Sequence, residues 1–170
     1  KGFNYSTIWD LILDFDRINS LLISDIKSYK YNSNYYKHDS VILINSNNII
    51  INEGCILNGG VIIKSEKSSP VVIGKNVEIG IGALIEGPVF IDDNSYIAPG
   101  SKIRPHTYIG KNSKVGGEVS CSIIGNYSNK AHDGFLGHSF IGDWVNIGAG
   151  TTNSNLKNTY SNVKVVIHEN

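Results

Sequence analysis

Residues 125–155, GNYSNKAHDGFLGHSFIGDWVNIGAGTTNSN, carry two histidines, His132 and His138, among closely spaced Gly and Asn. An ordinary histidine has a pKa of about 6.5 and is mostly neutral at pH 7, so either side chain could accept a proton as a general base or bind a metal. Gly and Asn adopt positive φ easily and suit tight turns, but a turn does not need histidine. The possible chemistry therefore depends on the elements that position this segment.

The chain before this segment repeats every six residues. From Leu43 to Val115 every sixth position is apolar except Lys67, which lies in the polar stretch KSEKSSP and is expected to form a loop inserted into the repeat. From Ile73 onward, the fourth residue after each apolar position is small. A period of six fits neither an α-helix nor a flat strand. It predicts a coil with three short strands per turn, in which aliphatic side chains stack in columns inside the coil.

The repeat changes phase near GGEVSCS. An insertion of two residues, or a bulge, is expected over residues 116–122. Beyond this point the repeat predicts inward positions at Ile123, Asn129, Phe135, Ile141 and Ile147.

The first 40 residues predict a different structure. The stretch STIWDLILDFDRINSLLISDIK places apolar side chains at helical spacing behind a Ser/Thr cap, and a polar linker rich in Tyr and Asn follows it. We therefore expect a connector helix and linker over residues 1–40 and the β-coil over residues 41–170. The predicted fold class is all-β with one N-terminal α-helix.

Composition excludes several functional classes. The formal net charge is +0, so there is no basic field to bind nucleic acid. No apolar run reaches the roughly 18 residues that span a membrane, and no secretory signal opens the chain. The two cysteines, Cys55 and Cys121, form no disulfide framework, are expected to act as small buried hydrophobes, and favour a cytoplasmic protein. The chain has no Met and begins at Lys1, so we expect a fragment of a longer protein.

The hexapeptide pattern, together with KVGGEV, SNKAHDGFLGHSFIGDWVNIGAGT and TTNSNLKN, resembles a known family. It is similar to the acetyltransferase half of the bifunctional glucosamine-1-phosphate acetyltransferase/N-acetylglucosamine-1-phosphate uridylyltransferase, and to related sugar-phosphate nucleotidyltransferases with a hexapeptide-repeat tail. The resemblance covers roughly residues 41–165. It implies a left-handed parallel β-helix, a homotrimer with active sites between subunits, acetyl-CoA as acyl donor, and a sugar phosphate or nucleotide sugar as the small-molecule partner.

The same resemblance implies roles for individual residues. His132 matches the general base that takes a proton from the sugar amine as the nitrogen attacks the thioester of acetyl-CoA. A turn of backbone N–H groups could hold the developing oxyanion. The other implied site residues are Asn155 beside the reacting groups, Asn146 and Phe135 at the sugar, Arg104 on the sugar phosphate, and Gly148, Ala149, Gly150 and Thr151 at the cofactor.

Three positions depart from that family. Its phosphate-binding Lys falls on Ser120, its Tyr after the histidine is Phe135, and a later Lys falls on Ser161. These differences favour an alternative function, a non-catalytic trimerising tail of a sugar-1-phosphate nucleotidyltransferase. No Gly-rich phosphate loop or Rossmann-type alternation occurs in this sequence, so any nucleotide transfer would reside upstream of Lys1.

Simpler structural roles remain open for the same residues. His132 could hydrogen-bond a corner of the coil, Asn146 and Asn155 could be turn residues, and Arg104 could be a surface ion-pair partner. A zinc hydratase using three histidines is disfavoured by their spacing along the chain, and no metal is expected. The three are His106, His132 and His138.

Overall fold

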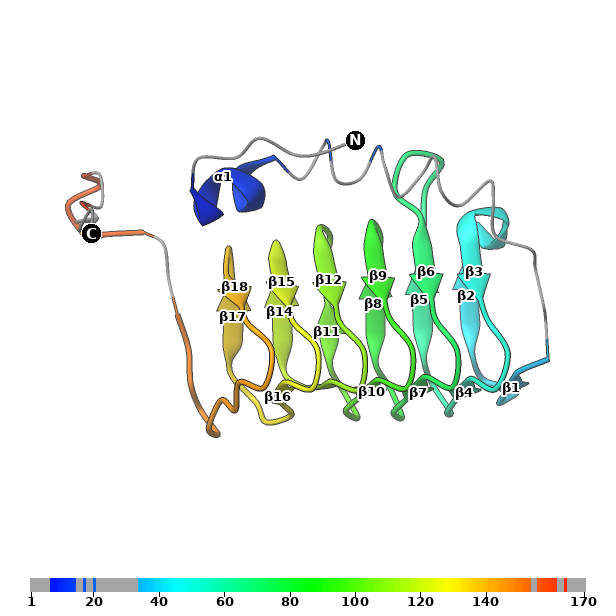
Figure 1. Cartoon of the computed structure of the whole chain (residues 1–170). Helices are drawn as coiled ribbons and strands as arrows, with labels where there is room; N and C mark the ends of the chain where they lie inside the picture. The colour runs from blue at the N-terminus through cyan, green and yellow to red at the C-terminus, as the bar shows by residue number, and fades with distance from the viewer. Residues whose placement is uncertain are drawn as a thin grey trace.

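The computed structural model describes residues 7–14, 17, 20, 34–153, 156–161 and 164. Within these ranges the chain forms eighteen short strands arranged in three parallel sheets (Figure 1). The first sheet contains β1 (Tyr36–Lys37), β4 (Ile56–Leu57), β7 (Glu78–Ile79), β10 (Tyr96–Ile97), β13 (Lys114–Val115) and β16 (Asn129–Lys130). The second contains β2 (Ile42–Ile44), β5 (Ile62–Lys64), β8 (Leu84–Glu86), β11 (Lys102–Ile103), β14 (Glu118–Ser120) and β17 (Phe135–Gly137). The third contains β3 (Ile49–Ile51), β6 (Val71–Ile73), β9 (Val89–Ile91), β12 (Thr107–Ile109), β15 (Ser122–Ile124) and β18 (Phe140–Ile141).

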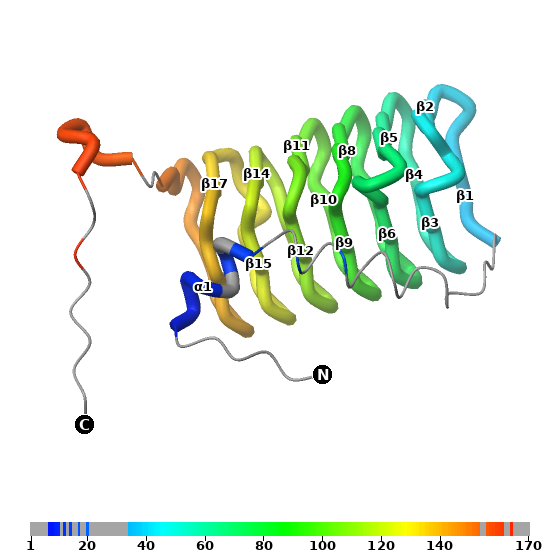
Figure 2. The backbone as a smooth tube through the Cα atoms, turned by 90° about the horizontal axis from the view of Figure 1, so that it is seen from above, coloured from blue at the N-terminus to red at the C-terminus, as the bar shows by residue number. Residues whose placement is uncertain are grey.

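Each coil of the chain contributes one strand to each sheet, and successive coils stack to form a prism with three faces (Figures 1 and 2). We number the coils 1 to 6 from β1–β3 to β16–β18. Strands pair with the strands one coil before and one coil after, so backbone groups are satisfied between coils. The predicted all-β parallel β-helix is confirmed.

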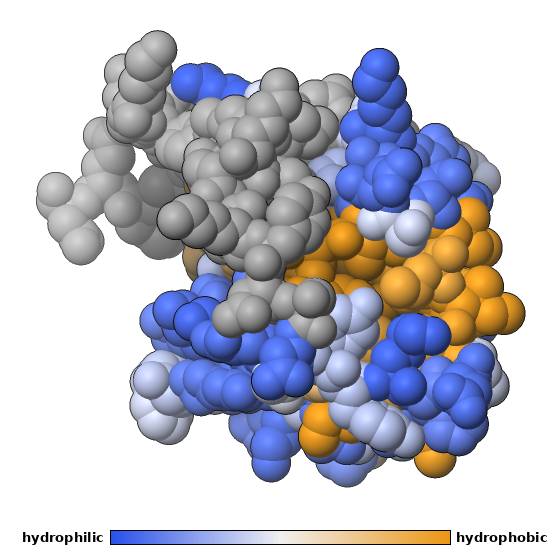
Figure 3. Space-filling model, turned by 90° about the vertical axis from the view of Figure 1, so that its right-hand side faces the viewer, coloured by the Kyte–Doolittle hydropathy of each residue, from blue (hydrophilic) through white to orange (hydrophobic). Residues whose placement is uncertain are grey.

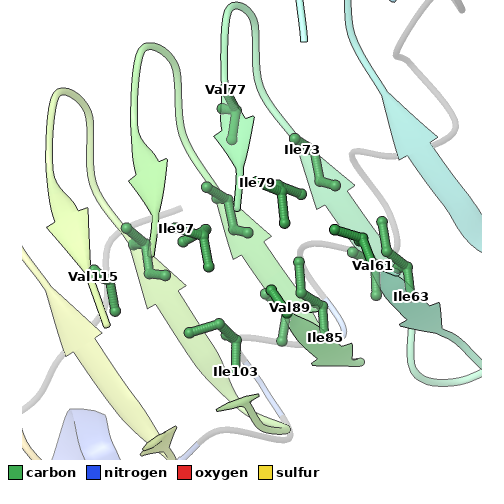
Figure 4. Close-up of a cluster of buried hydrophobic side chains, with 14 of the residues drawn as sticks. Val61, Ile63, Ile73, Val77, Ile79, Ile85, Val89, Ile97, Ile103 and Val115 are labelled. Atoms are coloured by element: carbon green, nitrogen blue, oxygen red, sulfur yellow. The ribbon is translucent and has the colours of Figure 1, made fainter. Parts of the chain in front are cut away.

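Columns of aliphatic side chains fill the interior, as the period of six predicts (Figure 4). Ile79, Ile97 and Val115 are register partners on the first sheet and all are 0% exposed. Burying each such side chain contributes about 1.5–3 kcal/mol. The small residues two positions before each column also point inward, and their hydroxyls serve the corners: Ser95 Oγ donates to Gly110 O at 2.8 Å.

Before the inserted loop, Leu43 lies in the column as predicted, because it pairs with Ile63, but the next three predicted positions require a correction. Ile51, Leu57 and Ile63 are the register partners of the later columns, because they pair with Ile73, Ile79 and Ile85. The predicted positions Ile49, Cys55 and Val61 are buried, but they lie two residues earlier, at the small inward position. The loop from β5 to β6 was expected and is present; its length shifts the phase across it.

The second change of phase arises because the corner of coil 5 is shorter than the corner of coil 4. The predicted insertion or bulge is therefore wrong. Four residues separate the first-sheet and second-sheet strands in coil 4, but only Gly116 and Gly117 separate β13 from β14 in coil 5. The inward residues that follow are Ile124, Lys130 and Leu136, so the predicted positions Ile123, Asn129 and Phe135 are each one residue out.

The N-terminal helix α1 spans Ile8–Leu13 and lies near β18 (Figures 1 and 2). The Thr7 amide donates to Asp10 Oδ2 at 2.9 Å, which is half of a capping box. Most of the predicted helix beyond Asp14 lies outside the described residues. Strand β1 falls within the stretch predicted as linker, and the proposed boundary at residue 40 remains a prediction. No helix in the described part of the chain combines the length and apolarity needed to cross a membrane.

At the coil 1 end of the prism, strands pair on one side only, and apolar side chains gather there (Figure 3). The large apolar residues exposed on β1 and β2 are Tyr36, Ile42 and Ile44. The opposite end, near coil 6, carries the segment with the two histidines.

Candidate active site

A notch in one edge of the prism adjoins the histidine segment. Coils 4 and 6 turn from the first sheet to the second through four residues, whereas coil 5 turns through Gly116 and Gly117 alone. The corner of coil 5 is therefore recessed between the two longer corners that flank it. The phase change in the sequence thus produces the hollow.

A surface pocket of about 290 Å³ lies in this notch. Its polar lining consists of Lys102, Glu118 and Asp133, and Phe135 supplies an apolar wall. Lys102, Glu118 and Phe135 are register partners on neighbouring strands of the second sheet, so their side chains follow one another along its outer face. The remaining lining residues are Gly100, Gly117 and Gly134. A hollow with one cation, two carboxylates and an aromatic wall suits a small polar ligand.

His132 lies in the four-residue corner of coil 6 and is exposed. That corner is held from both sides: the Glu118 amide of coil 5 donates to Gly134 O at 3.2 Å, and the Gly150 amide donates to Asp133 O at 3.0 Å. The exposed turn Gly148–Thr151 thus stacks directly on the histidine corner. The structure brings these two predicted parts of the site together.

The amides of the glycine-rich turn are partly used within the fold. Gly150 N–H is bonded to Asp133 O, and Thr151 N–H is 3.4 Å from Gly148 O. Within the described residues, no partner is assigned to the amides of Gly148 and Ala149. Any oxyanion held by this turn would therefore meet those two amides and not that of Gly150.

Arg104 and Phe135 lie on the second face, linked through Glu118. Arg104 Nη1 is 3.3 Å from Glu118 Oε1, and both side chains are partly exposed, so the pair contributes at most about 1 kcal/mol. The surface ion pair considered for Arg104 from the sequence is therefore present. Phe135 reaches the pocket, but Arg104 does not line it.

Other predicted site residues lie further apart. Asn146 is exposed and pairs by a backbone bridge with Asn129 on the first face. Asn155 lies outside the described residues. His106 and His138 both have positive φ at other corners, and no group of three His, Cys, Asp or Glu in the described ranges could hold a metal ion. Cys55 is buried as expected, whereas Cys121 is partly exposed.

Lys130 was missed by the sequence analysis. It occupies the interior column position after Val115 and is only 3% exposed. Its Nζ donates to Gly116 O and to His132 O, both at 2.8 Å. Burial lowers the pKa of Lys130, and the Asp133 carboxylate partly opposes this. The period of six pointed to Asn129 instead of Lys130 because the spacing is not constant here. Two steps of six back from Ile141 reach Asn129, but the step from Leu136 to Ile141 is only five residues long.

Comparisons with known proteins agree with this architecture. Residues 70–105 match the family model "Bacterial transferase hexapeptide (six repeats)". The chain is 32% identical over 161 residues to the bifunctional protein GlmU of Clostridioides difficile, covering 86% of this chain and 34% of that protein. It is 36% identical over 122 residues to GlmU of Thermodesulfovibrio yellowstonii, covering 71% of this chain and 25% of that protein. The chain spans about a third or less of the length of these curated relatives.

Solved structures share the fold at low sequence identity. GDP-perosamine N-acetyl transferase from Caulobacter crescentus, in complex with CoA and GDP-perosamine, has a TM-score of 0.57 and 18% identity, covering 77% of this chain and 60% of that one. The acetyltransferase domain of PglB from Neisseria gonorrhoeae has a TM-score of 0.52 and 15% identity, covering 81% and 62%. The resemblance predicted from the hexapeptide pattern is confirmed: this chain has the β-helix fold found in sugar acetyltransferases, and its β-helix is homologous to part of the GlmU proteins.

Proposed function

We propose that this β-helix is a CoA-dependent acyltransferase domain that transfers an acetyl group to the amine of an amino-sugar phosphate or nucleotide sugar. The observation that supports the proposal most directly is the position of the corner that carries the exposed His132, which is hydrogen-bonded to coil 5 on one side and to the turn Gly148–Thr151 on the other. Asp133 and Gly134 of this corner line the notch, and His132 directly precedes them in the chain without lining the pocket itself. Homology to GlmU and the structural likeness to an N-acetyl transferase in complex with CoA and GDP-perosamine support the same class.

The residues of the turn Gly148–Thr151 fit the acyl donor, acetyl-CoA. All four are exposed, and a Cβ placed on Gly148 or Gly150 would meet no atom within 4 Å, so a ligand could approach the backbone closely. The donor supplies a thioester whose carbonyl oxygen gains negative charge during attack. The amides of Gly148 and Ala149 would donate to that oxygen and stabilise the charge.

His132 would act as the general base. It accepts the proton that the sugar amine loses as its nitrogen bonds to the acyl carbon, and it returns the proton to the sulfur as the carbon–sulfur bond breaks. Glu118 and Asp133 at the notch would attract the protonated form of the amine before it reacts. The ammonium group of the acceptor would therefore be drawn to the corner that carries His132 and Asp133.

The remaining roles follow the resemblance. Asn155 would act beside the reacting groups and Asn146 at the sugar. Arg104 is engaged by Glu118, whereas Lys102 lines the pocket, so a substrate phosphate would meet Lys102 before Arg104. We also propose a cytoplasmic homotrimer in which neighbouring subunits complete each site.

A second candidate function is a non-catalytic, trimerising tail of a sugar-1-phosphate nucleotidyltransferase. The Arg104–Glu118 ion pair favours it, because Arg104, which the resemblance implies for binding the sugar phosphate, is already paired with Glu118. The two functions differ in whether the protein binds and consumes an acyl-CoA.

The test is acyl transfer from acetyl-CoA to a panel of amino-sugar phosphates and nucleotide sugars. The reaction is measured by the amount of CoA thiol that is released. His132→Ala should lower kcat by ~10²–10⁴-fold while CoA binding, measured by calorimetry, persists. The matched control is His138→Ala, an exposed histidine on a different corner, which should change kcat little. Unchanged turnover in His132→Ala would reject the base assignment, and absence of CoA binding in the unaltered protein would favour the tail.

A further inference from the structure

A lysine occupies a position in the interior column where the preceding coils carry aliphatic residues. Lys130 follows Ile79, Ile97 and Val115 in register on the first sheet. Removing a lysine ammonium from water costs several kcal/mol unless its donors are satisfied. An apolar side chain would fill the column at no such cost, so the contacts of the ammonium need an explanation.

The ammonium supplies a hydrogen bond that the shortened corner cannot form within itself. In coil 4 the carbonyl of Ala98 accepts from Ser101 N at 3.3 Å and from Ser101 Oγ at 2.6 Å, both within its own corner. The equivalent carbonyl in coil 5 is that of Gly116, whose corner has only two residues before β14. Lys130 Nζ donates to this carbonyl from the next coil at 2.8 Å.

The second bond of the same ammonium reaches the histidine corner. Lys130 Nζ donates to the backbone carbonyl of His132 at 2.8 Å, and the Gly116 amide donates to Lys130 O at 2.7 Å. One side chain therefore ties the recessed corner of coil 5 to the peptide that carries the exposed imidazole. The nearby charged group is the Asp133 carboxylate, which follows His132 in the same corner.

We infer that Lys130 is a positioning residue, which fixes the backbone at His132 from inside the β-helix and thereby restrains where the exposed imidazole lies. The inference rests on the proposed role of His132 as base. A misplacement of about 1 Å in a catalytic group can cost about 10²-fold in rate. Loss of the two hydrogen bonds should therefore be felt in kcat and not in the affinity for CoA.

The test uses Lys130→Met, which keeps an unbranched side chain one atom shorter than that of lysine but removes its donors. Two backbone carbonyls lose a partner while a buried charge disappears, so these opposing effects should leave the melting temperature within a few degrees. We expect kcat to fall at least about tenfold with the KM for acetyl-CoA unchanged. Lys130→Gln, which retains an N–H donor without the charge, should recover part of kcat. The control is Lys114→Met, an exposed lysine on β13, which should change neither quantity.

A readout independent of activity separates this inference from the proposed function. In NMR spectra, the His132 ring signals should shift or broaden in Lys130→Met and stay unchanged in Lys114→Met. Unaltered ring signals, or unaltered kcat, in Lys130→Met would overturn the positioning role. If Lys130→Met does not fold, the same two readouts in Lys130→Gln decide, and wild-type values there would overturn it. An active His132→Ala enzyme would instead overturn the proposed base.

Discussion

A methyl group added at Gly116 should disturb both the stack of coils and the histidine corner. A Cβ at this position would lie 2.7 Å from the carbonyl carbon of Ala131 and closer still to its oxygen. Ordinary van der Waals contact begins at 3.4 Å, so the contact with the carbon alone requires the backbone that precedes His132 to move by roughly 0.7 Å, and the contact with the oxygen requires a larger movement. The two nearest atoms belong to the main chain of Ala131, and the third is the methyl carbon of Ala98 at 3.1 Å, so no change of rotamer can relieve these contacts.

The expected cost of Gly116→Ala is about 1–3 kcal/mol of unfolding free energy, the usual range for overpacking. For a protein of this size this corresponds to a fall in melting temperature of roughly 2–12 °C. Urea unfolding followed by circular dichroism gives the free energy, and the acyl-transfer assay should show a parallel loss of kcat. The control is Gly142→Ala, where a Cβ meets nothing within 4 Å and no positive φ is required, so its stability should stay the same or rise slightly. A Gly116→Ala protein within about 0.5 kcal/mol of the unaltered one would refute the tight approach of coils 5 and 6.

Two further predictions concern the interior. Ile97→Ala removes a fully buried column residue and should lower the free energy of unfolding in urea by about 2–5 kcal/mol. Ile81→Ala, at a position 66% exposed, should change it by less than about 0.5 kcal/mol. Similar values for the two variants would contradict the burial of Ile97 in an interior column. Burial raises the pKa of the Cys55 thiol above its ordinary 9.0, so Cys55 should react with thiol reagents far more slowly than the partly exposed Cys121. The thiol ionises at a lower pH in the unfolded chain than in the folded protein. The contribution of Cys55 to the free energy of unfolding should therefore be constant below pH 9.0 and fall as the pH rises through the folded pKa. Cys55→Ala should remove this fall, and an identical pH profile in both proteins would show the reasoning to be wrong.

The regular coils were predictable because an aliphatic side chain recurs at every sixth residue, once per strand, and fills an interior column. Ile73, Ile79 and the later positions up to Val115 follow that rule without interruption, and every one is buried as expected. Prediction failed where a corner changed length. The loop after Lys64 and the two-residue corner at Gly116 each shift the register, and the sequence pattern alone does not say on which side of a shift a residue falls.

The segment that carries the candidate site was predictable from the sequence, but the surface around it was not. His132 and the turn Gly148–Thr151 were expected together from the resemblance, and the backbone bond from Gly150 to Asp133 places them side by side. The partnership of Arg104 with Glu118 depends on which residues two adjacent strands place opposite one another. The number of residues between Arg104 and Glu118 in the sequence does not show that their side chains are neighbours on the surface.

By itself, the sequence determined the repeating coil, its aliphatic columns and the segment that holds the histidines, because all three follow from the local spacing of side-chain types. Only the tertiary structure decided that Lys130 lies inside and that a notch opens beside the corner that carries His132, where Asp133 and Gly134 line it. Both depend on the length of the corner at Gly116 relative to the corners of the neighbouring coils. A recess exists only when the coils are stacked, and the direction of a side chain is set by the strand with which its own strand pairs.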